Sequence, residues 1–303
     1  MKSKSIVYIA LASDLLIAVT KFVAAGVTGS SAMISEGVHS VIDAISQVLL
    51  LWGIVTSKKK PDEERPFGYG RELYFWSFVV SLIIFTMGGC ISFYEGLLRF
   101  KRPVIEGNGF WNYMVLLVSF ILTSISALAS LKAFNRQRGD TTFWKAVTRS
   151  KDPSVFIVLL GDIGDLVCLL IAFAGIWLTH ALHNPHYDGI ASIVIGLVLI
   201  LISLLLVRES RSLLMGETIR KSTMQQIIAI AEADTSVQKI QQHFSVYMAP
   251  EEIILQMTAV FKDGLSTEQI TGGINNVIIA IQKQFPLIKK IFIEPVKKNS
   301  TLP

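Results

Sequence analysis

The first two-thirds of the chain alternates between long apolar runs and short polar connections. Six of these runs reach the roughly 20 apolar residues that a helix needs to cross a bilayer. They lie at about 6–27, 32–57, 74–98, 111–134, 154–179 and 187–207. The first run is longer than the apolar core of a signal peptide and lacks a clear cleavage site, so it predicts a retained helix.

Basic residues gather in alternate connections between these runs. The segments "SKKKPDEERPFGYGRE" and "KAFNRQRGDTTFWKAVTRSKD" are rich in Lys and Arg, as are the first residues and "RESR" after the sixth run. "VTGSS" has no charge and "HALHNPHYD" has no Lys or Arg, whereas "RFKRPVIEGNG" breaks the pattern with three basic residues. Because basic loops stay cytoplasmic, the pattern predicts a multi-pass membrane protein with both termini in the cytoplasm. The first residues do not resemble a mitochondrial presequence, which favours the inner (cytoplasmic) cell membrane.

The pattern changes after Glu217. "TIRKSTMQQIIAIAEA" has helical spacing, "VQKIQQHFSVYM" and "EEIILQMTAVF" resemble strands, "STEQITGGINNVIIAIQKQF" resembles a helix and "IKKIFIEPV" a last strand. This αββαβ order predicts a small α+β sandwich with two helices on one face of a sheet. We therefore expect a six-helix transmembrane domain at 1–208 and a cytoplasmic α+β domain at 209–303.

Composition agrees with this division. The chain is 51% hydrophobic and 17% charged, and its mean hydropathy of +0.54 is typical of a protein embedded in a lipid bilayer. The net charge of +5 comes from Lys and Arg in loops, which favours a topology signal over a nucleic-acid partner. The two cysteines, Cys90 and Cys168, lie in apolar runs and form neither a disulfide framework nor a Cys-x-x-Cys motif.

The second apolar run carries a polar stripe in "SEGVHSVIDAIS". Ser35, His39, Asp43 and Ser46 recur at helical spacing, and a charged side chain at bilayer depth costs about 3 kcal/mol. A His and an Asp one turn apart offer a nitrogen and an oxygen to one tetrahedral cation. The alternative is a hydrogen bond between them that only locks helix packing. The membrane setting favours the metal ligands, since buried ionisable residues there are usually functional.

The fifth run holds Asp162 and Asp165 on one face, in "VLLGDIGDLVCLL". Two carboxylates in hydrocarbon repel each other unless one is protonated or a cation lies between them. Direct metal ligation is favoured for Asp162. Asp165 is equally consistent with ligation and with a water-filled cavity or a basic partner.

Other polar residues carry weaker signals. Asp14 and Lys21 lie two turns apart in the first run. This spacing is consistent with a structural ion pair, an ion route or a proton relay. The loop "HALHNPHYD" holds His180, His183 and His186, but exposed histidines are common and a metal site there is the less favoured interpretation. His243 and the scattered acids of the last segment, such as Glu294, form no ligand cluster by spacing.

Taken together, these segments resemble the cation diffusion facilitator family. "TGSSAMISEGVHSVIDAISQ" is similar to the family's second-span motif with His-x-x-x-Asp, "PDEERPFGYGRELYFWS" to the loop entering the third span, and "YDGIASIVIGLVLI" to the start of the sixth. "SKDPSVFIVLLGDIGD" resembles the branch with mitochondrial-type zinc transporters and their bacterial relatives. The resemblance spans about 12–295 and implies a metal/proton antiporter with a ferredoxin-like cytoplasmic domain, working as a homodimer.

By this resemblance His39 and Asp43 match the second-span ligands and Asp162 matches the last fifth-span ligand. The family's other fifth-span ligand falls on Val158, so Asp165, a water or another span would complete the shell. In the loop after the second span, Arg65 and Tyr69 stand where histidines are expected, with only Asp62 left. We therefore expect the family's accessory metal sites, in this loop and in the cytoplasmic domain, to be absent or weak.

The implied function is export of Zn²⁺, or of Mn²⁺ or Fe²⁺, in exchange for protons. His39, Asp43, Asp162 and Asp165 are the expected metal ligands, and the metal is cargo, with no cofactor. Two other classes stay open. An intramembrane metal-dependent enzyme is disfavoured because no His-Glu-x-x-His motif occurs. A non-transporting partner subunit would account for Val158.

Overall fold

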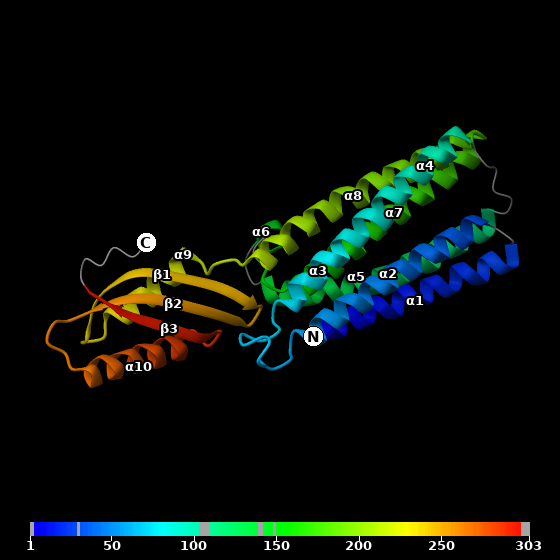
Figure 1. The fold of residues 1–303 in the computed structure, drawn as a ribbon. Coiled ribbons are helices and arrows are strands. Elements are labelled where there is room, and N and C mark those ends of the chain that lie inside the picture. Colours follow the sequence, from blue (N-terminus) through cyan, green and yellow to red (C-terminus); the bar gives the residue numbers. More distant parts are fainter. Residues whose placement is uncertain (1–2, 29–30, 103–108, 139–141, 148–149, 298–303) are drawn as a thin grey trace. The chain divides into compact units, whose positions relative to one another are not determined.

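The computed structural model describes residues 3–28, 31–102, 109–138, 142–147 and 150–297. The chain forms two compact units, Met1–Arg211 and Ser212–Pro303, and the first is built from long helices (Figure 1). These helices are α1 (Ser3–Thr28), α2 (Ser31–Thr56), α3 (Glu72–Ile83), η1 (Ile84–Cys90), α4 (Ile91–Lys101), α5 (Gly109–Arg138), α6 (Phe143–Val147), α7 (Pro153–Leu182) and α8 (His186–Met215).

Six helical spans in the described part of the chain are long and apolar enough to cross a membrane. They are Lys4–Val27, Gly37–Thr56, Glu72–Lys101, Phe110–Arg136, Pro153–Leu182 and His186–Met215. The six spans predicted from the apolar runs are thus confirmed. The side chain of Ser35, the first member of the predicted polar stripe, lies outside the described part.

The third span is not a uniform α-helix. Between α3 and α4 runs the π-helical segment η1, where the Ile91 backbone N–H donates to the Thr86 carbonyl, five residues back. A π segment changes the angular position of every side chain after it, and such segments are frequent at functional sites. The apolar pattern of the run gave no sign of it, because a single inserted residue barely changes mean hydropathy.

Glycines bring α4 and α8 into close contact. A Cβ on Gly96 would lie 2.5 Å from the backbone nitrogen of Ile193, and one on Gly196 would lie 2.5 Å from that of Phe93. Small residues allow membrane helices to approach this closely. The facing pairs run in antiparallel order along the two helices and are Gly89 with Ile200, Phe93 with Gly196, Gly96 with Ile193, and Phe100 with Gly189.

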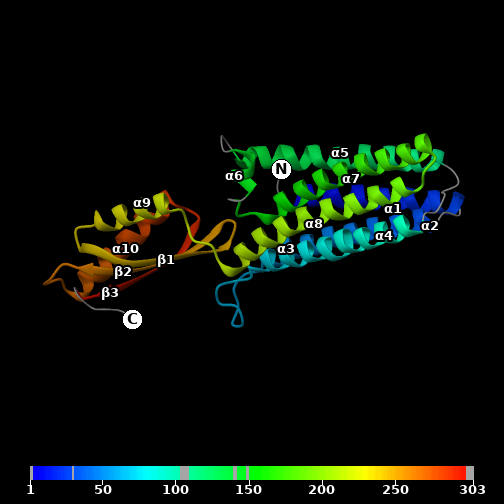
Figure 2. The same ribbon diagram turned by 90° about the horizontal axis from the view of Figure 1, so that it is seen from above.

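Helix α1 contacts three of the other long helices. It packs against α2, α5 and α7, while α5 also packs against α7 and α2 packs against α3 and η1. The long helices run alongside one another in both views (Figures 1 and 2). The helices that carry the predicted ligands, α2 and α7, are therefore both neighbours of α1.

The second unit has the predicted αββαβ order. It consists of α9 (Lys221–Glu232), β1 (Val237–Ala249), β2 (Glu252–Phe261), α10 (Thr267–Gln284) and β3 (Ile288–Val296). Strand β2 pairs antiparallel with β1 and parallel with β3, and α10 supplies the crossover that parallel neighbours require. Helix α10 begins at a capping box in which the Ser266 hydroxyl accepts from the Gln269 N–H.

One apolar core joins both helices of this unit to the sheet. Ile227 and Ala231 of α9, Ile281 of α10 and Leu255 and Met257 of β2 are fully buried in it, and α9 contacts α10. Two helices that touch each other and share a core with the sheet lie on the same face of it. The α+β fold predicted for this segment is confirmed.

Candidate metal site in the membrane unit

His39 and Asp43 lie one turn apart on α2, facing the π segment of the third span. A Cβ on Gly88 of η1 would lie 4.0 Å from the His39 Cε1 atom. Each side chain is about one-third exposed, 31% for His39 and 35% for Asp43. Both groups thus remain accessible between helices while sitting within a predicted membrane span.

The separation of the two groups bears on their role. His39 Nε2 and Asp43 Oδ2 are 3.9 Å apart, beyond hydrogen-bonding distance. A tetrahedral Zn²⁺ with ligand bonds of about 2.0–2.1 Å places its ligand atoms roughly 3.4 Å apart. The pair is spaced more like two ligands of one cation than like a hydrogen-bonded lock.

The start of α7 is fixed by local sequence. The Asp152 side chain accepts a hydrogen bond from the Ser154 N–H at 3.1 Å, and Pro153 occupies the first turn, where its missing N–H and fixed φ are no cost. At 1.5 Å per residue, Asp162 then lies roughly 14 Å into the helix. Val158, one turn earlier, is 1% exposed and packs as an ordinary apolar core residue.

Asp162 is held by two serines of α5. The Ser126 hydroxyl lies 3.0 Å from Asp162 Oδ1 and 2.9 Å from Oδ2, and the Ser130 hydroxyl lies 3.0 Å from Oδ2. The Asp162 residue is 6% exposed. Neither serine was among the sequence candidates. The available signal was the hydroxyl spacing of Thr123, Ser126 and Ser130 along one face of a membrane helix.

Asp165 and Asp14 extend the acidic region across three helices. Asp165 lies within electrostatic range of Asp43 and Asp162, and Asp14 of α1 interacts with all three of these carboxylates. The Lys21 ammonium, which donates to the Ser40 hydroxyl at 2.9 Å, acts on both Asp14 and Asp165. These electrostatic interactions link carboxylates of α1, α2 and α7, with Lys21 also in range.

The predicted ligands are not gathered into one coordination shell. Among the described residues, no group of three or more His, Cys, Asp or Glu side chains is close enough to hold a metal ion. His39 and Asp43 form one half of the predicted set, and Asp162, turned to the serines of α5, forms a separate part. Helix movement would be needed to join them.

The histidines between α7 and α8 have individual structural roles. His183 ends α7 in a left-handed conformation with φ 51°. His186 Nδ1 is 3.0 Å from the Phe100 carbonyl at the end of α4, and nearby Arg99 forms an ion pair with Asp188 at 3.0 Å. These contacts fasten the start of α8 to α4, in keeping with the structural interpretation of this loop. His243 is exposed on β1, and none of these histidines belongs to a ligand group in the described part.

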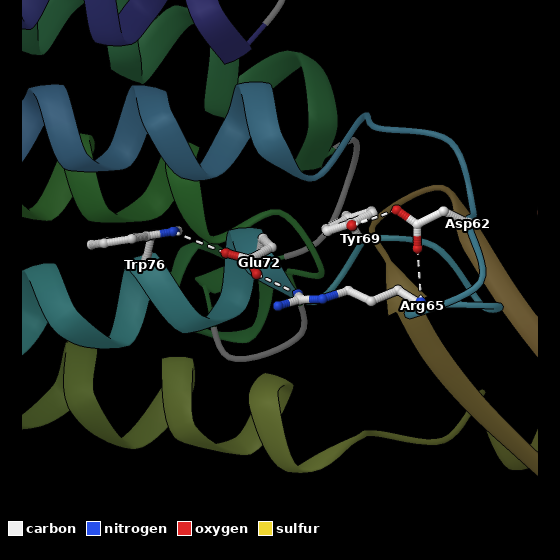
Figure 3. A network of polar contacts seen from close by, with 5 residues as sticks. All are labelled: Asp62, Arg65, Tyr69, Glu72 and Trp76. Carbon is white, nitrogen blue, oxygen red and sulfur yellow. Dashed lines mark hydrogen bonds and ion pairs between the residues drawn. The ribbon is translucent and has the colours of Figure 1, made fainter.

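The loop between α2 and α3 holds a closed polar network in place of a metal site (Figure 3). Tyr69 donates to Asp62 Oδ2 at 2.6 Å, and the Arg65 backbone N–H donates to Oδ1 at 2.8 Å. The Arg65 side chain pairs with Glu72, whose other oxygen accepts from Trp76 Nε1 at 3.0 Å. The Arg65 guanidinium also lies over the Tyr69 ring, 4.7 Å from its centroid.

These contacts shift the pKa values of Asp62 and Tyr69 in opposite directions. The hydrogen bond from Tyr69, and then the one from the Arg65 backbone, lower the pKa of Asp62. The same bond to Asp62 raises the pKa of Tyr69. Asp62 thus stays ionised and Tyr69 stays a donor over the whole physiological range.

A family model for the cation efflux transmembrane domain matches residues 7–215, more than half of the chain. The chain belongs to the cation diffusion facilitator family. The family consists of metal transporters, not enzymes, so the metal is cargo and no cofactor is expected. The enzyme interpretation is thereby set aside, and the multi-pass membrane character follows from the six spans and the family.

Individual members of this family align with most of the chain. The human mitochondrial proton-coupled zinc antiporter SLC30A9 is 34% identical over 73% of the chain. The manganese efflux system protein MneP of Bacillus subtilis is 23% identical over 96% of the chain and 95% of its own length. Metal tolerance protein C4 of Arabidopsis thaliana is 28% identical over 83% of the chain and 54% of its own length. The chain spans only 39% of the length of the mouse and human zinc antiporters.

Proposed function

We propose that this transporter exports a divalent cation, Zn²⁺ in the first place, from the cytoplasm in exchange for protons. His39, Asp43 and Asp162 bind the metal and carry the protons, and Asp165 is their fourth partner. The observation that carries the proposal is that Asp14 of α1 and Asp165 of α7 each interact electrostatically with Asp43 of α2 and Asp162 of α7, inside the membrane unit.

The chemistry of this group supports exchange. Carboxylates close together in a low-dielectric interior must be neutralised by protons or by a cation. Imidazole and carboxylate ligands must lose their protons to bind a metal, so metal and protons compete for the same atoms. A site that holds either cargo, and that opens alternately to each side, exchanges one for the other.

Alternating access is consistent with the incomplete shell. The α2 pair and Asp162 belong to different helices that meet only across α1 and their neighbours. In the proposed cycle, metal binding draws α7 toward α2, and protonation of the carboxylates releases it. The cycle thus needs a relative shift of two helices that both pack against α1.

Zinc is proposed over manganese and iron because a histidine ligand favours it, although three carboxylates also suit Mn²⁺ or Fe²⁺. The names of the relatives divide in the same way: the human protein is named as a zinc antiporter and the bacterial one as a manganese efflux protein. We further propose an inner-membrane location, cytoplasmic termini, a membrane domain at 1–208 with the α+β domain at 209–303, and a homodimer.

A second candidate is a partner subunit that does not transport metal itself. It is favoured by Val158, a buried apolar residue where the family's pattern has a ligand, and by the absence of a three-ligand group in the described chain. In that case Asp43→Ala leaves cellular metal tolerance unchanged, while removal of the segment after 208 abolishes function.

The test is metal uptake into proteoliposomes under an imposed pH gradient. Zn²⁺, Mn²⁺, Fe²⁺ and Cd²⁺ are compared for the wild type, Asp43→Ala and Asp162→Ala, with Ser119→Ala as a control on a buried hydroxyl of α5. Uptake of Zn²⁺ that follows the gradient and stops in both Asp variants supports antiport through this site. Uptake that persists in Asp162→Ala removes Asp162 from the site, and no uptake of any metal favours the partner subunit.

A further inference from the structure

Within the described residues, the hydrogen bonds to the Asp162 carboxylate come from two neutral hydroxyl groups. Ser126 and Ser130 reach its two oxygens over 2.9–3.0 Å, and the two serines are 2% and 0% exposed. Hydroxyl donors orient a carboxylate without cancelling its charge, whereas a lysine or arginine partner would cancel it. The negative charge of Asp162 therefore remains available to a cation.

The number of hydrogens leaves room for a metal. Each serine hydroxyl carries one hydrogen, and the Ser130 hydroxyl also lies 3.1 Å from the Ala127 carbonyl, so at most two hydrogens reach the roughly four acceptor positions of the carboxylate. Lone pairs remain on the side not facing α5, and a metal can bond there without displacing either serine. This arrangement differs from one in which metal and serines compete for the same positions.

The helical spacing of Ser126 and Ser130 on α5 brings both hydroxyl donors to Asp162. Ser126 and Ser130 are four residues apart and therefore share one face of α5, and α5 packs along α7. Both hydroxyls point to one side chain 36 and 32 residues further along the chain. Ser119, also buried at 2% on α5, makes no hydrogen bond within the described residues, so the contact to Asp162 is specific to two positions.

We propose that Ser126 and Ser130 are positioning residues of the metal site, which hold the Asp162 carboxylate in its ligating orientation and make α5 a third helix of that site. This inference rests on the proposed function, in which Asp162 is a metal ligand. Partners that orient a metal ligand usually contribute 10–100-fold to metal affinity.

The experiment measures Zn²⁺ affinity of the purified full chain in detergent by competition with a chelator, together with Tm. Ser126→Ala with Ser130→Ala is expected to weaken Zn²⁺ binding about 10–100-fold. Ser126→Ala alone is expected to give an intermediate loss, and it keeps the test open should the double variant not fold. Ser119→Ala removes an equally buried hydroxyl and is expected to bind as the wild type does.

The outcomes separate this inference from the proposed function. If Asp162→Ala loses Zn²⁺ binding and the serine variants bind like the wild type, the positioning role is overturned and the ligand assignment stands. If Asp162→Ala binds normally, both are overturned. A weakened affinity in the serine variants with equal loss in Ser119→Ala would show a general packing effect, which also overturns the positioning role.

Discussion

The chain holds two groups of acidic residues that differ in what neutralises them. In the loop after α2, Asp62 and Glu72 have a tyrosine, a tryptophan and the Arg65 guanidinium as fixed partners. Within the membrane spans, Asp43 and Asp162 both act on Asp165, with Lys21 as the cation in range of Asp165. The loop carries its own cation, whereas the membrane group has an excess of negative charge.

The difference shows how one residue type serves two purposes. A carboxylate with a built-in cationic neighbour is a structural element and gains little from a metal. A carboxylate kept among other carboxylates in low dielectric is destabilising until a cation or proton arrives. The proposed transport site therefore lies where negative charge is left uncompensated. In the loop between α2 and α3, where the family resemblance implies an accessory metal site, the polar side chains already have one another as partners.

The largest expected effect comes from neutralising the membrane group. Asp43→Asn is expected to lower Zn²⁺ transport more than about 100-fold, exceeding the usual loss of an outer-shell partner. The same change is expected to raise Tm in metal-free detergent by a few degrees, because it removes repulsion from Asp14 and Asp165. Flux assays and thermal melts check the two effects, with Ser203→Ala on α8 as control. Retained transport in Asp43→Asn, or a lower Tm, would contradict the prediction that Asp43 supports transport at the expense of stability.

The next effect comes from opening the loop network. Arg65→His combined with Tyr69→His removes the fixed cation and places two imidazoles beside Asp62. In a background of Asp43→Ala and Asp162→Ala, the double variant is expected to bind about one additional Zn²⁺ per chain. Metal-to-protein ratios after gel filtration measure it. Arg65→Gln with Tyr69→Phe supplies no imidazole and serves as the matched control, and equal ratios in the two variants would contradict the prediction.

A smaller effect is expected from removing only the ion pair. Arg65 is 49% exposed and Glu72 17% exposed, and exposed ion pairs contribute little because water and salt screen them. Arg65→Met is expected to lower the free energy of unfolding by less than about 1 kcal/mol and to leave Zn²⁺ transport unchanged. A larger loss in chemical denaturation would mean that the network supports the start of α3.

The smallest expected effect is a change in the pKa of Tyr69. The pKa of Tyr69 is raised, so its bond adds stability below the ordinary value of about 10 and loses it as pH rises through the folded value. The pKa of Asp62 is lowered, so its contribution is present above about 3.8 and is lost as pH falls through the folded value. Asp62→Asn is expected to return the Tyr69 pKa toward 10, as followed by NMR of ¹³C-labelled tyrosine. An unchanged titration would show that the bond does not form in solution.

The architecture could be predicted from the sequence because the signals for it are local. Six apolar runs and an αββαβ pattern are local signals, and both appear in the structure. The π segment at Ile84–Cys90 was not predicted, because a single inserted residue leaves the apolar pattern of the run almost unchanged. Gly161 and Gly164 illustrate the same limit. A Cβ on Gly164 would lie 2.7 Å from the Ile202 side chain, whereas one on Gly161 would meet nothing within 4 Å, and the sequence does not distinguish the two.

The candidate ligands could be named from the sequence, but their contacts could not. His39 with Asp43, and Asp162 with Asp165, are visible as pairs at helical spacing. The hydroxyls that hold Asp162 come from a different helix, and no periodicity within one helix reveals such a partner. The substitution of histidines by Arg65 and Tyr69 was visible, but the ion pair to Glu72 that closes the loop required the fold.

The interlocked glycines of α4 and α8 also bear on how this protein changes over evolutionary time. A new side chain on either helix meets the backbone of the other at Gly96, Gly189 and Gly196, so acceptable replacements at these positions must arise jointly in both helices. A one-residue insertion would put all facing pairs out of register together. We expect lineages to diversify at outward positions such as Tyr94 and Leu201, which are 61% and 68% exposed, while the shared surface is inherited as a single unit.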